Sequence, residues 1–176
     1  RPANFYSPYE AAVWSIVSAR RSRTQGIVLR RRLAEAYGVV LTVAGRPVPV
    51  VPTPAQLSAV EQLPGLPADR IPRLRAIAEA AQRGDLDVTR LAAMEPAQAM
   101  SQLQQLPGIG PFYSSLIMVR ACGLTDLLAV EPQVLERLRA VYGRTIDASE
   151  LTELAEAWRP WRTWVLVMLR VLGGRA

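Results

Sequence analysis

The sequence predicts an all-α protein that also contains one small β-hairpin. Capping residues and prolines typical of helix starts recur along the chain. Between them, apolar residues recur at helical spacing, and glycines follow where the pattern stops. Only one stretch alternates as a β-strand does. Half of the 176 residues are apolar, which is enough for a hydrophobic core.

The first two helices are predicted over residues 8–20 and 22–37. Each follows a serine that can cap the helix, and Glu10 or Gln25 stands three residues after that serine. Gly38 is expected to stop the second helix. Residues 39–51 then alternate around Ala44-Gly45-Arg46, which predicts a β-hairpin whose prolines confine its strands to sheet edges.

The rest of the chain predicts further helices, most of them beginning at a proline or a capping residue and ending near a glycine or before the next proline. They begin at Thr53-Pro54, after Leu66-Pro67, at Pro96, at Pro111, at Pro132, at Asp147 and at Pro160.

The composition excludes several kinds of catalytic site. All 21 basic residues are arginine, so the chain has no histidine for a Ser-His-Asp system and no lysine for a Schiff base. A single cysteine, Cys122, excludes an internal disulfide, a zinc site of several thiolates and a cysteine-held iron–sulfur cluster. Chemistry must therefore rest on carboxylates, arginines, hydroxyls, aromatics and the backbone.

The charge favours a polyanionic partner. The 21 basic and 15 acidic residues give a net charge of +6, and the pI is 10.4. The apolar run over residues 164–172 is too short for a membrane span and contains Arg170. With no signal-peptide pattern, we expect a soluble intracellular protein without a membrane partner.

Residues 104–123, QQLPGIGPFYSSLIMVRACG, are the most informative segment. One helix is predicted to end at Leu106 and the next to begin at Pro111, with Gly108 and Gly110 between them. Glycines leave backbone N–H groups exposed at a helix N-terminus, an arrangement that binds phosphate. A plain helix–helix turn is the alternative, but the basic charge favours the phosphate interpretation.

LPGIG followed by an aromatic residue, an apolar helix, Arg120-Ala121 and Gly123 resembles the helix-hairpin-helix DNA glycosylase superfamily, with the branch of 3-methyladenine DNA glycosylase II most similar. The resemblance covers nearly the whole chain and includes Ser7-Pro8-Tyr9-Glu10 and Trp158-Arg159-Pro160-Trp161-Arg162.

The resemblance implies two helical lobes on either side of a DNA-binding cleft. One lobe would combine residues 1–52 with 144–176, and the other would contain residues 53–143, with the helix-hairpin-helix at 96–122. Double-stranded DNA with a damaged base would be the partner of a monomeric protein at the nucleoid of a bacterial cytoplasm. The damaged nucleotide would be flipped between the lobes.

The resemblance also assigns roles around the hairpin. Gly108, Ile109, Gly110 and Tyr113 would bind a DNA phosphate. The carbonyls of Gln104, Leu106 and Ile109 would hold a structural Na⁺ or K⁺ ion, unless they only cap their helix. No catalytic cofactor, iron–sulfur cluster or zinc is implied.

The base pocket would contain Phe112, Leu116 and Arg170. Strand-cleaving members carry a lysine where this chain has Phe112, so lyase activity is not expected. Phe112 resembles the aromatic that stacks on a flipped base; its alternatives are a core position, or exposure of Tyr113 in its place. An arginine at 170 suits a cationic alkylated purine poorly.

The lid that fills the gap in the DNA would consist of Ala19, Arg20 and Arg21. A solvated charge cluster is the alternative for these residues.

The catalytic carboxylate is the main departure from the family. Counting from the hairpin places Pro132 where the family has aspartate. Matching the helix that follows places Glu131 there, directly before a proline at a helix start. Glu131 is therefore the candidate catalytic residue, and simple helix capping is its alternative.

These observations predict a monofunctional DNA glycosylase that removes a damaged, alkylated base in base excision repair. The alternative is a catalytically inactive or weakened paralogue that binds DNA and senses lesions.

Overall fold

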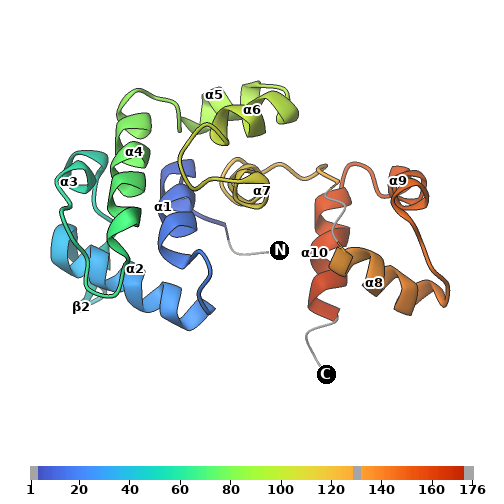
Figure 1. Ribbon diagram of the computed structural model, residues 1–176, viewed down its shortest axis with the longest axis horizontal. Coiled ribbons are helices and arrows are strands. Elements are labelled where there is room, and N and C mark those ends of the chain that lie inside the picture. The colour runs from blue at the N-terminus through green and yellow to red at the C-terminus, as the bar shows by residue number, and fades with distance from the viewer. Residues whose placement is uncertain (1–3, 129–131, 173–176) are drawn as a thin grey trace. The chain divides into compact units, whose positions relative to one another are not determined.

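The computed structural model describes residues 4–128 and 132–172 and contains the predicted all-α fold with one β-hairpin (Figure 1). The chain divides into two compact units, one over Ala3–Cys122 and the other from Gly123 onward. The elements of the first unit are α1 (Pro8–Ser18), α2 (Arg23–Tyr37), β1 (Val39–Val43), β2 (Arg46–Val50), α3 (Pro54–Ser58), α4 (Ile71–Gln82), α5 (Val88–Ala93), α6 (Pro96–Leu103) and α7 (Pro111–Arg120).

Local capping explains where the first helices begin. Ser7 accepts a hydrogen bond from the backbone N–H of Glu10, and Ser22 and Gln25 form a reciprocal capping box at α2. These starts confirm the sequence prediction. The six-residue α5 was not predicted, although Asp87 caps it by accepting from the N–H of Arg90.

Helix α1 is central to the first unit and lies between α4 and α7 (Figure 1). Ala11, Ala12 and Val17 are fully buried, and small side chains on a helix let its neighbours approach closely. This packing holds α7, and with it the turn that joins α6 to α7, against the core. The hairpin of β1 and β2 pairs Val39 with Val50 and turns at Ala44 and Gly45, which have positive φ.

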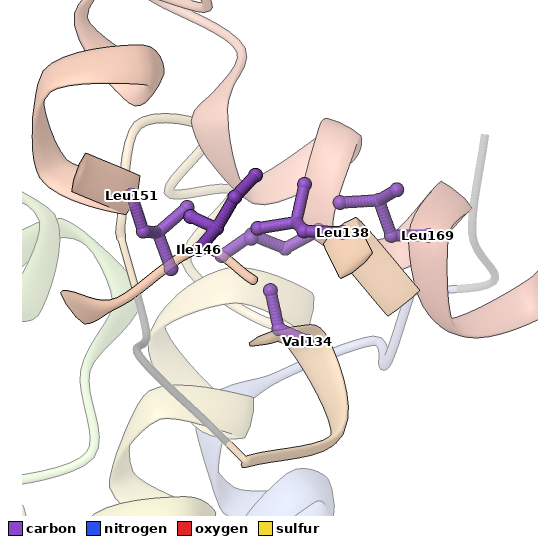
Figure 2. Packing of buried hydrophobic residues seen from close by; sticks show 6 residues of the cluster. Val134, Leu138, Ile146, Leu151 and Leu169 are labelled. Atoms are coloured by element: carbon purple, nitrogen blue, oxygen red, sulfur yellow. The ribbon is translucent and has the colours of Figure 1, made fainter. Parts of the chain in front are cut away.

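The second unit contains α8 (Pro132–Tyr142), α9 (Ala148–Glu156) and α10 (Arg162–Leu172). Its core consists of aliphatic side chains from these helices and the connection between α8 and α9, as Figure 2 shows: Val134, Leu138, Ile146, Leu151, Leu166 and Leu169.

Residues 126 and 127 are hydrogen-bonded to residues at the start of α10 and just before it. The carboxylate of Asp126 accepts hydrogen bonds from Arg162 (Nε at 2.6 Å) and from Arg159 (Nη1 at 2.7 Å). The hydroxyl of Thr163 accepts from the N–H of Leu127 at 2.8 Å. The hydrogen bond from Arg162 holds the pKa of Asp126 below its usual value.

We expect Asp126→Asn to lower the melting temperature of the second unit at neutral pH. The melting temperature of this variant should also fall less than that of the wild type as the pH is lowered. A carboxyl with a lowered folded-state pKa stabilises the fold above its unfolded pKa of about 4, and that stabilisation is lost as the pH falls through the folded value. Thermal melts from pH 7 to 2 measure this. Glu153→Gln is the control, since Glu153 is exposed and has no ion pair in the described part of the chain. Equal acid profiles for wild type and Asp126→Asn would contradict the expectation.

The predicted lobe that joins both chain ends stays a prediction. Within the first unit, the N-terminal helix α1 packs on α2, α4 and α7. None of the helices in the described ranges is long and apolar enough to span a membrane.

Candidate nucleic-acid interface

The turn between α6 and α7 is a short hydrogen-bonded loop anchored by one apolar side chain. The N–H of Leu106 donates to the carbonyl of Leu103 at 3.1 Å, and the N–H of Ile109 donates to the carbonyl of Leu106 at 3.0 Å. The Ile109 side chain is 3% exposed, so it fixes the loop to the core. The flanking Pro107 and Gly108 remain exposed.

Gly108 is required by both its backbone and its surroundings. Its φ is +91°, in the region where residues with a β-carbon are strained. A β-carbon there would lie 2.9 Å from Cδ1 of Ile16 and 3.1 Å from Cδ of Arg73. The loop therefore lies directly over α1 and α4, and only glycine fits at this close approach.

We expect Gly108→Ala to destabilise the first unit by about 1–3 kcal/mol, because it combines positive φ with contact against a core isoleucine. Gly110→Ala is the matched control. Gly110 has φ −94°, and a β-carbon on it would meet no atom within 4 Å, so its cost should stay below about 1 kcal/mol. Urea unfolding measures both, and equal losses would contradict this account of Gly108.

Gly110 leaves the N-terminus of α7 open. It is the N-cap residue, and no side chain makes a capping hydrogen bond there. The first amide bonded back to the cap is that of Ser114, whose N–H donates to the carbonyl of Gly110 at 2.9 Å. In the described residues, the N–H groups of Gly110, Phe112 and Tyr113 have no acceptor. These donors, with the positive end of the helix dipole, suit an anion.

Three carbonyls are expected to hold an alkali ion, and their other hydrogen bonds decide whether they are available for it. In the described residues, the carbonyls of Gln104 and Ile109 accept no hydrogen bond, and that of Leu106 accepts one, from Ile109. Carbonyl oxygen has two lone pairs, so all three retain acceptor capacity. The side chain of Gln104 donates to the Ser114 hydroxyl at 3.0 Å, which joins the end of α6 to α7.

The aromatic pair at the start of α7 faces solvent in part. Phe112 is 56% exposed, so the core position considered for it is wrong. Tyr113 is half-buried and meets Phe112 edge to face, with ring centroids 5.3 Å apart. Leu116 is also half-buried, one turn further along α7. Their roles in a base pocket stay predictions.

Arg73 approaches this turn at Gly108, and Arg70 lies close enough to Arg73 and Arg21 to be affected by their charges. Arg70 is 9% exposed, and its Nη1 donates to the carbonyl of Ile16 at 2.7 Å. Burial lowers the pKa of Arg70, and the nearby charges of Arg21 and Arg73 lower it further. Arg73 also pairs with Asp69 at 2.8 Å. Positive charge therefore accumulates under and beside the loop that contains Gly108.

The predicted lid residues form the bend between α1 and α2. Ala19 caps the end of α1, and Arg20 has φ +56°, which is uncommon for a residue other than glycine. Arg21 is half-buried, and its Nη2 donates to the carbonyl of Gly65 at 2.8 Å. Arg20 is exposed, so both the lid role and the alternative of a solvated charge cluster stay predictions for these residues.

Two predicted site residues cannot be placed with the others. Glu131 lies outside the described residues. Arg170 lies in α10, and its side chain is likewise outside what the structure describes.

Sequence reasoning missed Arg70 and Arg73. Their only sequence signal is the i, i+4 spacing of Asp69 and Arg73, which predicts an ordinary helix ion pair.

Comparison by sequence finds no relatives: no protein-family model matches the chain, and no curated protein is significantly similar to it. Comparison of folds does find similar solved structures. DNA-3-methyladenine glycosidase from Bacillus halodurans is 23% identical, with a TM-score of 0.78 over 96% of this chain and 76% of that one. The 3-methyladenine DNA glycosylase of Schizosaccharomyces pombe is 18% identical, with a TM-score of 0.70 over 96% and 83%.

A third similar structure is the 8-oxoguanine glycosylase/lyase of Clostridium acetobutylicum in complex with double-stranded DNA. It is 16% identical, with a TM-score of 0.71 over 93% of this chain, and this chain spans 58% of its length. The fold thus matches proteins with different names and little sequence in common. The chain has the fold of the helix-hairpin-helix DNA glycosylases.

Proposed function

We propose that this protein is a monofunctional DNA glycosylase, which binds duplex DNA and hydrolyses the N-glycosidic bond of a damaged, alkylated base. The observation that carries the proposal is the open N-terminus of α7, where the N–H groups of Gly110, Phe112 and Tyr113 lack acceptors in the described residues. In a glycosylase fold with a +6 chain, a DNA phosphate is the anion that suits these donors best.

The residues present support a hydrolytic rather than a strand-cleaving reaction. The chain has no lysine, so no side-chain amine can form a Schiff base with the sugar, and Phe112 stands where such a lysine would be. Glu131 is the proposed catalytic carboxylate. Its negative charge would stabilise the positive charge that develops on the sugar as the bond to the base breaks.

An alkali ion at the carbonyls of Gln104, Leu106 and Ile109 belongs to the same proposal. Such an ion would add positive charge beside the bound phosphate. The chain keeps these carbonyls available for the ion, because, of the three, only the carbonyl of Leu106 accepts a hydrogen bond in the described residues.

A second candidate function is lesion sensing without catalysis. Glu131 replaces the aspartate of the family that the sequence resembles. Asp126, the nearest carboxylate that precedes Glu131 in the sequence, is already bound by Arg159 and Arg162. Both observations favour a protein that binds damaged DNA and does not release the base.

A panel of duplexes, each with one alkylated, deaminated or oxidised base, separates these functions. Base release with intact strands supports the hydrolytic enzyme. Tight, lesion-dependent binding without release supports the sensor. Strand cleavage without added alkali would contradict the monofunctional assignment, and failure to bind any duplex would contradict both.

A further inference from the structure

Arginines also line a hollow at the bend between α1 and α2. The hollow measures about 540 Å³, and its walls include Arg20, Arg21, Thr24, Leu29, Arg32 and Gly65. No acidic residue is among its described lining residues. We call it the Arg21–Arg32 hollow.

Two of these arginines contact backbone carbonyls rather than carboxylates, Arg21 at short range and Arg32 at long range. Nη2 of Arg21 donates to the carbonyl of Gly65 at 2.8 Å, and Nη1 of Arg32 donates to that of Pro64 at 3.4 Å. Within the described residues, neither arginine forms an ion pair. A guanidinium has five donors, so each retains several for a ligand, and the charges of both remain unneutralised.

Gly65 keeps one wall of the hollow open. Its φ is +89°, and a β-carbon on it would lie 3.2 Å from Nη1 of Arg32 and 3.3 Å from Cδ2 of Leu29. A larger residue would press on the Arg32 guanidinium. Thr24 and Gln25 of the first turn of α2 also line the hollow, and the positive end of the helix dipole there adds to the arginine charges.

The hollow is electrostatically continuous with the turn before α7. Arg21 lies near enough to Arg70 to affect its titration, as does Arg73. Arg73 in turn runs beneath Gly108, where its Cδ would be 3.1 Å from an added β-carbon. Arg21, Arg70 and Arg73 would therefore attract the same polyanion. Of these three, Arg73 is paired with a carboxylate, that of Asp69.

We propose that the Arg21–Arg32 hollow binds a phosphate group and is a second contact for the DNA backbone, separate from the turn at Gly108. This proposal rests on the proposed function for the identity of the phosphate as DNA. The chemistry it requires, a fork of guanidinium donors around an oxyanion, does not depend on base release.

The test compares Arg32→Gln with Arg31→Gln. Both remove one positive charge from adjacent positions of α2, but Arg31 points away into solvent and pairs with Glu35 at 2.8 Å. Duplex affinity is measured from low to high salt for each variant. A lost phosphate contact reduces the slope of log affinity against log salt by about 0.9 on duplex DNA. We expect this reduction, with a several-fold loss of affinity, for Arg32→Gln and not for Arg31→Gln.

A second arm uses inorganic phosphate and the NMR signals of the arginine Nε–H groups. We expect phosphate to shift the signals of Arg21 and Arg32 in the wild type, and Arg32→Gln to remove the shift of Arg21. Arg21→Gln is the second variant, used if thermal melts show that Arg32→Gln unfolds. A phosphate shift with equal salt slopes would support the site and assign its ligand to a free phosphate compound.

Absence of both the phosphate shift and the slope difference overturns the proposal. Failure of the proposed function is distinguishable from this outcome. If the protein releases a base from a duplex but its hollow does not bind phosphate, the glycosylase assignment holds and the phosphate site is contradicted. Phosphate binding in the hollow by a protein that binds no duplex would support the phosphate site and contradict the glycosylase assignment.

Discussion

Gly110→Asp is expected to leave the protein as stable as the wild type while lowering its affinity for duplex DNA by a factor on the order of ten to a hundred. Aspartate is a favoured N-cap residue, and the extended backbone of Gly110 accepts it without strain. Its carboxylate would accept from the free N–H groups of α7 and gain from the helix dipole. The same negative charge would occupy the place proposed for a DNA phosphate, where repulsion between like charges lowers affinity.

Gly110→Asn separates charge from shape in this experiment. Asparagine also caps a helix and has nearly the same size, but it brings no charge. We expect it to weaken duplex binding less than aspartate does, with the difference shrinking as salt rises. Fluorescence anisotropy of a labelled duplex measures affinity, and thermal melts measure stability. Unchanged affinity in Gly110→Asp would mean that the segment at Gly108 and Gly110 is a plain helix–helix turn.

Features that depend on local sequence could be predicted, and they were. Ser22 and Gln25 cap α2 through contacts within three residues, so the sequence alone locates the helix start. The alternation around Ala44-Gly45 indicates the hairpin, and Gly45 suits the positive φ found there, whereas Ala44 gives no sign of its own positive φ. The α6–α7 turn was predictable for the same reason. A short helix such as α5, with one buried leucine, offers too little periodicity to be found.

Features that depend on distant contacts could not be predicted. Asp126 and Arg162 are 36 residues apart, and nothing local indicates that they bind each other. Arg73, which approaches Gly108, belongs to α4, so only the packing of α1 against α4 and α7 brings it there. Sequence resemblance indicated the hairpin donors but gave no sign of Arg70 or of the Arg21–Arg32 hollow.

Glu131→Gln is expected to abolish base release and leave duplex binding nearly intact, if Glu131 is the catalytic carboxylate. That assignment comes from matching the helix after Glu131 to the family that the sequence resembles. Glutamine keeps the shape and can still accept a capping hydrogen bond. It lacks the negative charge that the developing positive sugar requires, and such electrostatic stabilisation is often the largest catalytic contribution. Single-turnover release from the best duplex of the panel measures the rate, and anisotropy on the same duplex measures binding.

Glu131→Asp tests the same residue in the opposite direction, because it restores the side chain of the family that the sequence resembles. Shortening the side chain by one methylene moves the carboxylate by about an ångström, a displacement that can change a rate about a hundredfold. A weakened glycosylase would gain rate from this change wherever the loop lets the shorter chain reach the sugar. If Glu131 only caps its helix, both variants would alter stability by about 1 kcal/mol or less and leave release unchanged.

Release that survives Glu131→Gln would contradict the assignment and direct attention to Asp126. That carboxylate is held by Arg159 and Arg162, and its lowered pKa keeps it ionised at neutral pH. Its two arginine partners neutralise the charge that a positively charged sugar would need, so Asp126 should stabilise the fold and contribute little to the reaction. Asp126→Asn in the Glu131→Gln background decides between the two, since any activity that Asp126 provides would disappear in the double variant.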